Sequence, residues 1–124
     1  MDFELSEEQR AFRAMAADFA AGEMAPFAAE WDRACTFPEE TLRKAAALGL
    51  AAMNVDPAHG GSGLGRLDAA VVLEELARAC PSTAAYLSIH NMVATMIDRF
   101  GTDAQRAERL PPLASMAHFA AYCL

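Results

Sequence analysis

The stretch LDAAVVLEELARACPS, residues 67–82, decides the fold. Its apolar residues recur with the period of an α-helix, and those expected to face inward are Ala69, Val72, Leu73, Leu76 and Ala77. Pro81 lacks an N–H and should break this helix, and Ser82 should cap a second helix that runs to Phe100. The residues of the second helix expected to face inward are Leu87, Ile89, Val93, Met96, Ile97 and Phe100.

The segments before this stretch are also predicted to be helical. Ser6 to Gln9 has the pattern of a capping box and opens a helix that Pro26 should end. A short helix should then carry Phe27 and Trp31, and another should begin at Pro38 and end at Gly49. The expected buried faces of the first and third helices are Phe12, Met15, Ala16, Phe19, and Leu42, Ala45, Ala46, Leu48.

The segments after it complete an all-α prediction. Thr102 to Gln105 repeats the capping-box pattern and opens a short helix that should stop at Pro111 and Pro112. Residues 118–124 are almost all apolar or aromatic, and the Tyr-Cys-Leu ending leans towards a β-strand. We therefore expect an up-and-down or orthogonal bundle of five to six helices, with the start of a strand at the C-terminus.

Composition limits the classes of function. The 124 residues suffice for about one domain, and 17 acidic against 10 basic residues give a net charge of −7. The sequence holds no basic cluster of the kind that binds nucleic acid. It also shows no secretory or transit signal and no apolar run of 18 residues, so the expected location is the cytoplasm.

Most chemical motifs are absent or incomplete. Gly60 to Gly65 has the glycine spacing of a phosphate-binding loop, but Arg66 and Leu67 stand where Lys and a hydroxyl are needed, so a surface turn is expected. The histidines and cysteines lack metal-ligand spacing, and a metal site is not expected. Cys35, Cys80 and Cys123 are interpreted as buried thiols, the pair Glu74 and Glu75 as a solvated face, and His59 as solvated. His90 is interpreted as a core or interface imidazole, with a ligand contact as the alternative.

Several segments, in order, resemble the acyl-CoA dehydrogenase family. They are Leu5 to Arg10, the Glu30-Trp31-Asp32-Arg33 and Phe37-Pro38 segment, Leu48 to Leu50, His59 to Leu64, Leu73 to Arg78, His90-Asn91, Phe100 to Thr102, and Leu110 to Ser115. Two positions depart from the family pattern. His59 stands where Tyr is common, and Met116 replaces the usual Gly. Neither position belongs to the family's known chemistry.

The resemblance implies that residues 1–117 are the helical N-terminal domain and residues 118–124 the first strand of a middle β-domain. It implies an FAD-dependent enzyme that oxidises an acyl-CoA at its α and β carbons, passes electrons to an electron-transfer flavoprotein and assembles as a homo-oligomer, often a tetramer. No catalytic residue is expected within this chain, because the family's catalytic Glu lies further on. Tyr122, Cys123 and Leu124 are the expected flavin-contacting residues.

The resemblance also implies that the helix from Ser82 lines the acyl end of the substrate pocket. Tyr86, Ile89, His90 and Val93 are the candidate pocket residues. Because Tyr86 is large, it should shorten the pocket and favour a short or branched acyl group such as isobutyryl. Two alternatives remain open: a related flavoenzyme of the same fold, such as an acyl-CoA oxidase or flavin monooxygenase, and a non-catalytic helical interaction module.

Overall fold

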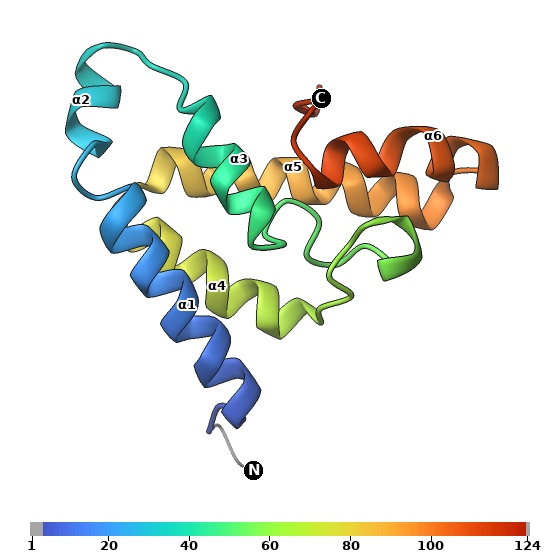
Figure 1. The fold of residues 1–124 in the computed structure, drawn as a ribbon, viewed down its shortest axis with the longest axis horizontal. Helices are drawn as coiled ribbons and strands as arrows, with labels where there is room; N and C mark the ends of the chain where they lie inside the picture. The colour runs from blue at the N-terminus through green and yellow to red at the C-terminus, as the bar shows by residue number, and fades with distance from the viewer. Residues whose placement is uncertain (1–3, 124) are drawn as a thin grey trace.

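The computed structural model describes residues 4–123, which form six α-helices and a short 3₁₀ turn (Figure 1). In chain order, the elements are α1 (Glu7–Glu23), α2 (Ala28–Arg33), α3 (Glu39–Ala47), η1 (Pro57–His59), α4 (Arg66–Ala79), α5 (Pro81–Phe100) and α6 (Asp103–Ala114). The all-α prediction is therefore confirmed. None of these helices is long and apolar enough to cross a membrane.

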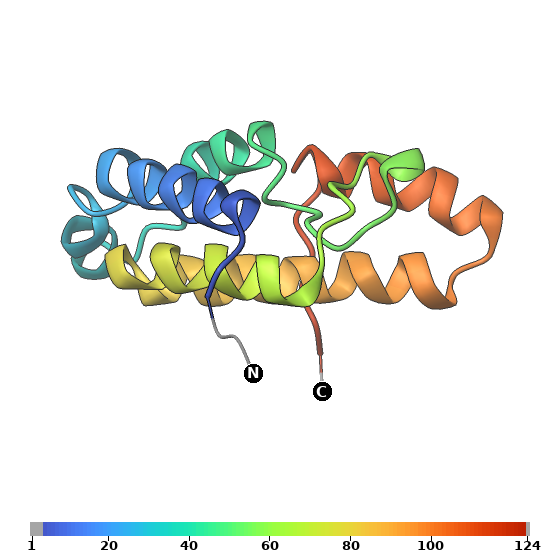
Figure 2. The same ribbon diagram turned by 90° about the horizontal axis from the view of Figure 1, so that it is seen from below.

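The helices form two layers. Helices α4 and α5 lie in one layer, and α1, α3 and α6 lie over them in the other (Figure 2). Helix α1 packs along α4, α4 along α5, and α5 along α6. The main core lies between the layers and contains Phe19 from α1, Leu42 from α3, Leu76 from α4 and Leu87 from α5. A smaller second cluster joins α5 to α6 through Ala94, Leu110 and Leu113, among others.

Local chemistry sets the helix ends. Both predicted capping boxes form: the Ser6 hydroxyl accepts from the Gln9 N–H at 3.1 Å, and the Thr102 hydroxyl accepts from the Gln105 N–H at 3.3 Å. Gly49, just past α3, has φ +81°, which glycine adopts without steric cost. The cap of α5 was wrongly predicted. Cys80, not Ser82, is both the last cap of α4 and the first cap of α5, because Pro81 fits the first helical position.

One further predicted helix end is wrong, and the C-terminal strand stays a prediction. Helix α6 continues through Pro111 and Pro112 to Ala114. Prolines remove their own N–H donors but keep their carbonyls, and here the Pro111 oxygen accepts from the Ser115 N–H at 3.1 Å. The strand expected at 118–124 is not formed within the described residues, where 119–123 have no strand partner. Leu124 lies outside those residues.

The chain turns sharply after α6. Met116 has φ +52°, in the left-handed region, and its side chain is fully buried in the main core. The Met116 N–H donates to the Leu113 carbonyl at 3.0 Å. Beyond this turn the C-terminal segment, residues 118–123, passes from the layer of α6 across α5 (Figure 2).

Several exposures differ from those predicted. Leu48 is exposed because it lies at the end of α3, past its last buried turn. On α5 the buried residues are Thr83, Ala84, Leu87, His90, Asn91 and Ala94, whereas Ile89, Met96 and Phe100 are exposed. Only one face of a helix can pack on the core, and on α5 this face is formed by residues 87, 90, 91 and 94. Cys35 and Cys123 are exposed, and Cys80 alone among the three cysteines is buried as expected.

A buried amide ties α5 to the segment that follows α3. The Asn91 Oδ1 atom accepts from the Met53 N–H at 2.7 Å, and its Nδ2 atom donates to the carbonyls of Leu50 (2.8 Å) and Leu87 (2.9 Å). Residues 50–53 and Val55 are almost closed to water although they are not helical. Their backbone polar groups therefore need partners from other elements, and Asn91 supplies two of these contacts.

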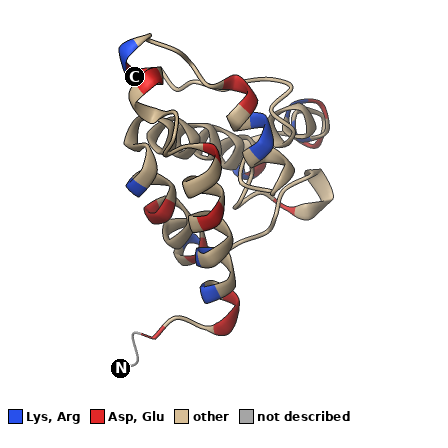
Figure 3. Cartoon of the chain, turned by 60° about the vertical axis from the view of Figure 1, so that its left-hand side comes forward, with Lys and Arg blue, Asp and Glu red and all other residues tan. Residues whose placement is uncertain are grey.

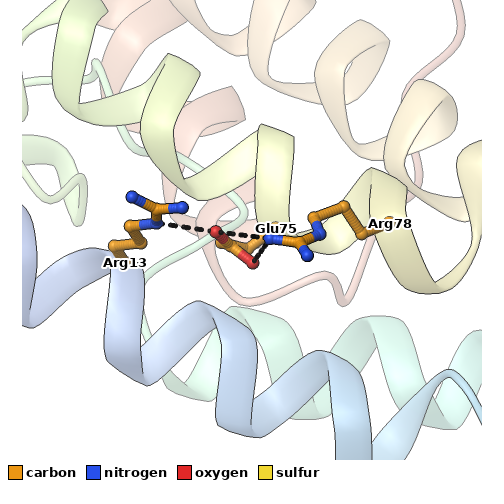
Figure 4. A network of polar contacts seen from close by, with 3 residues as sticks. All are labelled: Arg13, Glu75 and Arg78. Carbon is orange, nitrogen blue, oxygen red and sulfur yellow. Dashed lines mark hydrogen bonds and ion pairs between the residues drawn. The ribbon is translucent and has the colours of Figure 1, made fainter.

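Glu75 is buried, contrary to the prediction of a solvated pair, whereas Glu74 is exposed. The Glu75 carboxylate accepts a hydrogen bond from Arg13 Nε of α1 at 2.8 Å and lies 3.4 Å from Arg78 of α4 (Figure 4). The Arg13 hydrogen bond is the main cause that lowers the pKa of Glu75. The residue therefore links α1 to α4 as a carboxylate.

Replacing Glu75 by Gln should reduce stability at neutral pH, because the buried carboxylate loses its ion pairs with the partly exposed Arg13 and Arg78. A carboxylate with a lowered folded pKa stabilises the fold above its unfolded pKa, roughly 4.3, and loses that contribution as pH falls through the folded value. The gap between the urea midpoints of the two proteins should therefore be largest near pH 7 and shrink towards pH 3.

Glu74→Gln is the matched control for this change, since Glu74 is the exposed neighbour on the same helix. Its urea midpoint should stay close to that of the unmodified chain at both pH values. A Glu75→Gln gap that is constant from pH 7 to pH 3 would show that Glu75 does not act through its charge.

Candidate functional site

The four predicted pocket residues all lie on α5, but the structure separates them. His90 is fully buried, Tyr86 and Val93 are half-buried, and Ile89 is 38% exposed. Tyr86 and His90 are near each other, with ring centroids 6.1 Å apart. Ile89 instead lies on the exposed side of the helix. These four residues therefore do not line one common pocket within the described chain.

Tyr86 forms one wall of a half-open cavity of about 260 Å³ between the α2–α3 connection and the start of α5. The cavity is mostly apolar, and its lining includes Trp31, Phe37, Leu42, Cys80, Thr83 and Tyr86. The Phe37 ring meets the Tyr86 ring edge to face, with centroids 4.8 Å apart. A second groove of about 320 Å³ lies between α4 and α5 and includes Leu73, Met92, Met96 and Phe100.

The Tyr86 hydroxyl is closed to water and has no hydrogen-bond partner among the described residues. Burial raises the pKa of Tyr86, and the nearby Ala120 N–H partly offsets that rise. The hydrogen bond of the Ala120 amide goes to His90 Nδ1, at 3.2 Å. Tyr86 thus holds a desolvated O–H donor that has no acceptor among residues 4–123.

His90 has both ring nitrogens engaged. Its Nε2 atom lies 3.0 Å from the Leu113 carbonyl of α6, and its Nδ1 atom lies 3.2 Å from the Ala120 N. Burial is the main cause that lowers its pKa, so the ring is neutral near pH 7. Of the two readings left open by the sequence, the structure supports the satisfied core imidazole.

The predicted flavin-contacting residues lie at the end of the C-terminal segment. Tyr122 and Cys123 are exposed, and Leu124 is outside the described residues. Within the described residues, 4–123, the backbone N–H and C=O groups of residues 121–123 make no hydrogen bond. Extended backbone with free N–H and C=O groups fits the amide-like edge of a flavin ring, which carries donors and acceptors in one plane. This segment can supply only a small part of such a site.

The glycine-rich loop, residues 60–65, makes hydrogen bonds to the buried segment of its own chain. Ser62 N–H donates to the Ala52 carbonyl at 3.0 Å, and Leu64 N–H donates to the Met53 carbonyl at 2.7 Å. A side chain at Gly61 would place a Cβ atom 2.0 Å from the Val55 carbonyl oxygen. The loop therefore covers the buried residues 50–55, and its inward N–H groups are not free to hold a phosphate.

Charges and metal ligands define no further site. Acidic and basic residues are interspersed along the helices in the view of Figure 3. Within residues 4–123, no group of three or more His, Cys, Asp or Glu side chains could hold a metal ion. Sequence patterns missed Asn91 and the partners of Glu75, because a helix repeat does not distinguish a buried polar residue from an exposed one.

Comparison with known proteins gives the class of this fold. Residues 6–117 match the family model described as "Acyl-CoA dehydrogenase, N-terminal domain". The chain therefore belongs to the acyl-CoA dehydrogenase family. This result confirms the resemblance seen in the sequence motifs.

Comparison with individual proteins shows which members of the family this chain resembles. The chain is 53% identical over 120 residues to an isobutyryl-CoA dehydrogenase of Bos taurus that is named as mitochondrial, covering 97% of this chain and 29% of that protein. Butyryl-CoA dehydrogenase from Megasphaera elsdenii superposes with a TM-score of 0.84 at 31% identity, over 96% of this chain and 32% of that one. The structure of PigA with FAD and proline gives 0.89 at 29% identity over the same shares.

Replacing Tyr86 by Phe removes the unpartnered hydroxyl and keeps the ring in its aromatic contacts. Stability should stay the same or rise by up to about 1 kcal/mol, because an unsatisfied buried O–H is costly. Thermal unfolding of the two proteins measures this. A clear loss of stability in the Phe variant would show that the hydroxyl has a partner after all.

Proposed function

We propose that this chain is the helical part of a flavin-dependent enzyme that oxidises a short or branched acyl-CoA to its α,β-unsaturated product. The observation that carries the proposal is the 53% identity to an isobutyryl-CoA dehydrogenase across 97% of this chain. The chain spans 29% of that relative, so the proposed catalytic base and most of the cofactor site belong to polypeptide outside residues 1–124.

FAD is the proposed cofactor, and when bound it would accept the hydride from the β-carbon of the acyl group. The FAD in the PigA structure supports this choice. Tyr122, Cys123 and Leu124 are the proposed contacts to the flavin, through the backbone that follows Ala120. The division into a helical domain, 1–117, and a β-domain that begins at 118 stays a prediction, and Phe119 and Ala120 still pack on the helical core.

The helical domain would border the acyl end of the substrate pocket with Tyr86, Ile89, His90 and Val93. Tyr86 offers an aromatic wall beside the 260 Å³ cavity, and Ile89 offers exposed apolar surface. His90 would contribute from the interior, since both of its nitrogens are engaged. An electron-transfer flavoprotein is the proposed electron acceptor, and a homo-oligomer the proposed assembly.

The cytoplasmic location expected from the sequence also stays a prediction. The name of the bovine relative, which places that protein in mitochondria, counts against it.

One observation favours the non-catalytic alternative, an interaction module. Phe100 is 81% exposed, and it borders the apolar groove between α4 and α5.

The direct test is a visible absorption spectrum of the protein purified from its natural source, recorded before and after anaerobic addition of isobutyryl-CoA. Flavin bands that bleach on addition are expected. A colourless protein would contradict the proposal and favour the interaction module. Rapid recolouring of the reduced protein by oxygen would instead indicate the related oxidase or monooxygenase chemistry.

Replacing Tyr86 by Ala in the flavin-bound protein should widen the range of acyl lengths accepted, because truncating the ring enlarges the 260 Å³ cavity. The ratio of kcat/KM for hexanoyl-CoA to that for isobutyryl-CoA should rise about tenfold or more, the effect of one to two methylene groups in an apolar pocket. Tyr86→Phe is the control and should leave the ratio unchanged. An unaltered ratio in the Ala variant would place Tyr86 outside the acyl pocket.

A further inference from the structure

Two hydrogen bonds and two ring contacts fix the C-terminal segment before it leaves the helical core. The His118 N–H donates to the Pro112 carbonyl at 3.0 Å, and the Ala120 N–H donates to His90 Nδ1 at 3.2 Å. Between them the Phe119 ring contacts Phe37 and Tyr86, with ring centroids 5.5 Å and 6.3 Å away. The segment is thus attached to α5 and α6 as far as Ala120.

The ring of Phe119 is held from several sides. It packs against the main core, and the guanidinium of Arg43 from α3 lies over its face, 5.1 Å from the centroid. Ala120 belongs to the second cluster, which joins α5 and α6. Side-chain packing alone would still let the backbone rotate about Phe119. The hydrogen bond to His90 determines which way the Ala120 N–H points.

The partners of His90 define its protonation. A backbone carbonyl can only accept a hydrogen bond, and a backbone N–H can only donate one. Nε2 therefore carries the proton and donates to Leu113 O, while Nδ1 is bare and accepts from Ala120. A second proton on Nδ1 would face the Ala120 N–H and break this contact. Full burial of the ring favours the same neutral form.

Ala120 is the last residue with such a contact. Past it, residues 121–123 make no hydrogen bond within the described part of the chain, and their side chains are exposed. Three extended residues reach roughly 10 Å from the anchor. A slip of one residue in an extended segment turns every side chain to the opposite face. The orientation of Tyr122 and Cys123 therefore depends on how firmly Ala120 is held.

We infer that His90 is a positioning residue, whose Nδ1 atom fixes Ala120 and thereby sets the register of residues 121–123 against the cofactor. This inference rests on the proposed function, since it assumes that Tyr122 and Cys123 meet a flavin. His90 is fully buried with both ring nitrogens engaged, so it would not contact the flavin directly. It acts through the backbone of the C-terminal segment, which crosses α5 to the opposite side of the molecule (Figure 2).

Two substitutions separate the roles of the two ring nitrogens. In His90→Asn, the side-chain oxygen takes the place of Nδ1 and can accept from Ala120, while the donor to Leu113 is lost. In His90→Gln, the side-chain nitrogen takes the place of Nε2 and can donate to Leu113, while the acceptor for Ala120 is lost. Both changes replace the ring by an amide that keeps one of its two polar contacts, so each is the control for the contact that the other loses.

The experiment uses the flavin-bound protein and compares flavin spectrum, flavin affinity and amide exchange. We expect His90→Gln to shift the visible and circular dichroism bands of the flavin, weaken flavin binding and speed exchange of the Ala120 amide about tenfold, the effect of one lost hydrogen bond. We expect His90→Asn to stay near the unmodified protein in all three. A His90→Gln protein equal to the unmodified one, or two variants altered alike, would overturn the inference.

A measurement on the unmodified protein covers the case in which the variants do not fold. Nitrogen-15 chemical shifts of His90 report which ring nitrogen carries the proton, and we expect Nε2 alone. A proton on Nδ1 would overturn the inference, because Ala120 could not then donate to it. Failure of the proposed function is a separate result: an unmodified protein without flavin bands refutes it, whereas a flavin-bound protein insensitive to His90→Gln refutes only the positioning role.

Discussion

The structure depends on satisfying the backbone of a buried segment that is not helical. Residues 50–53 and Val55 lie between the two layers and are almost closed to water. An unpaired peptide group there would cost about as much as a lost hydrogen bond. Neighbouring elements therefore supply hydrogen-bond partners for the backbone of this segment. Asn91 reaches it from α5, and the glycine-rich loop covers it from the other side. Helix α3, helix α5 and the glycine-rich loop thereby share one polar centre, around which the apolar residues pack.

Much of the fold could be predicted from the sequence because its signals are local. Capping boxes at Ser6 and Thr102, and the glycine after α3, act within one turn of helix, and each has the predicted effect. The errors in side-chain exposure share one cause: exposure depends on which neighbour a helix meets. Phe100 fits the apolar repeat of α5 and yet is exposed, while Glu75 breaks the repeat of α4 and yet is buried, because Arg13 of α1 lies opposite it. Such pairings join residues far apart in the chain and leave no local pattern.

The candidate site was harder to predict than the fold, for the same reason. The family resemblance implied that Tyr86, Ile89, His90 and Val93 line the acyl pocket, but His90 is buried in the core and Ile89 is exposed. The contact between His90 and Ala120 spans 30 positions and could not be inferred from spacing. Family membership, in contrast, was visible in the sequence, since it rests on many short motifs in a fixed order and the family model matches the same region, residues 6–117. The helical domain supplies one wall of the proposed site and holds the segment that leads to the rest.

Met116 bears on how this position can vary among relatives. Its left-handed backbone costs a residue with a side chain about 1–2 kcal/mol, and a glycine at this position, the residue usual in the family the sequence resembles, would avoid that cost. The buried thioether side chain offsets it with about 1.5–3 kcal/mol of apolar burial. The two residues are therefore nearly equivalent in energy, but only Met couples this turn to the core packing. A change of Met116 to Gly would leave a void in the core unless neighbouring side chains moved to fill it.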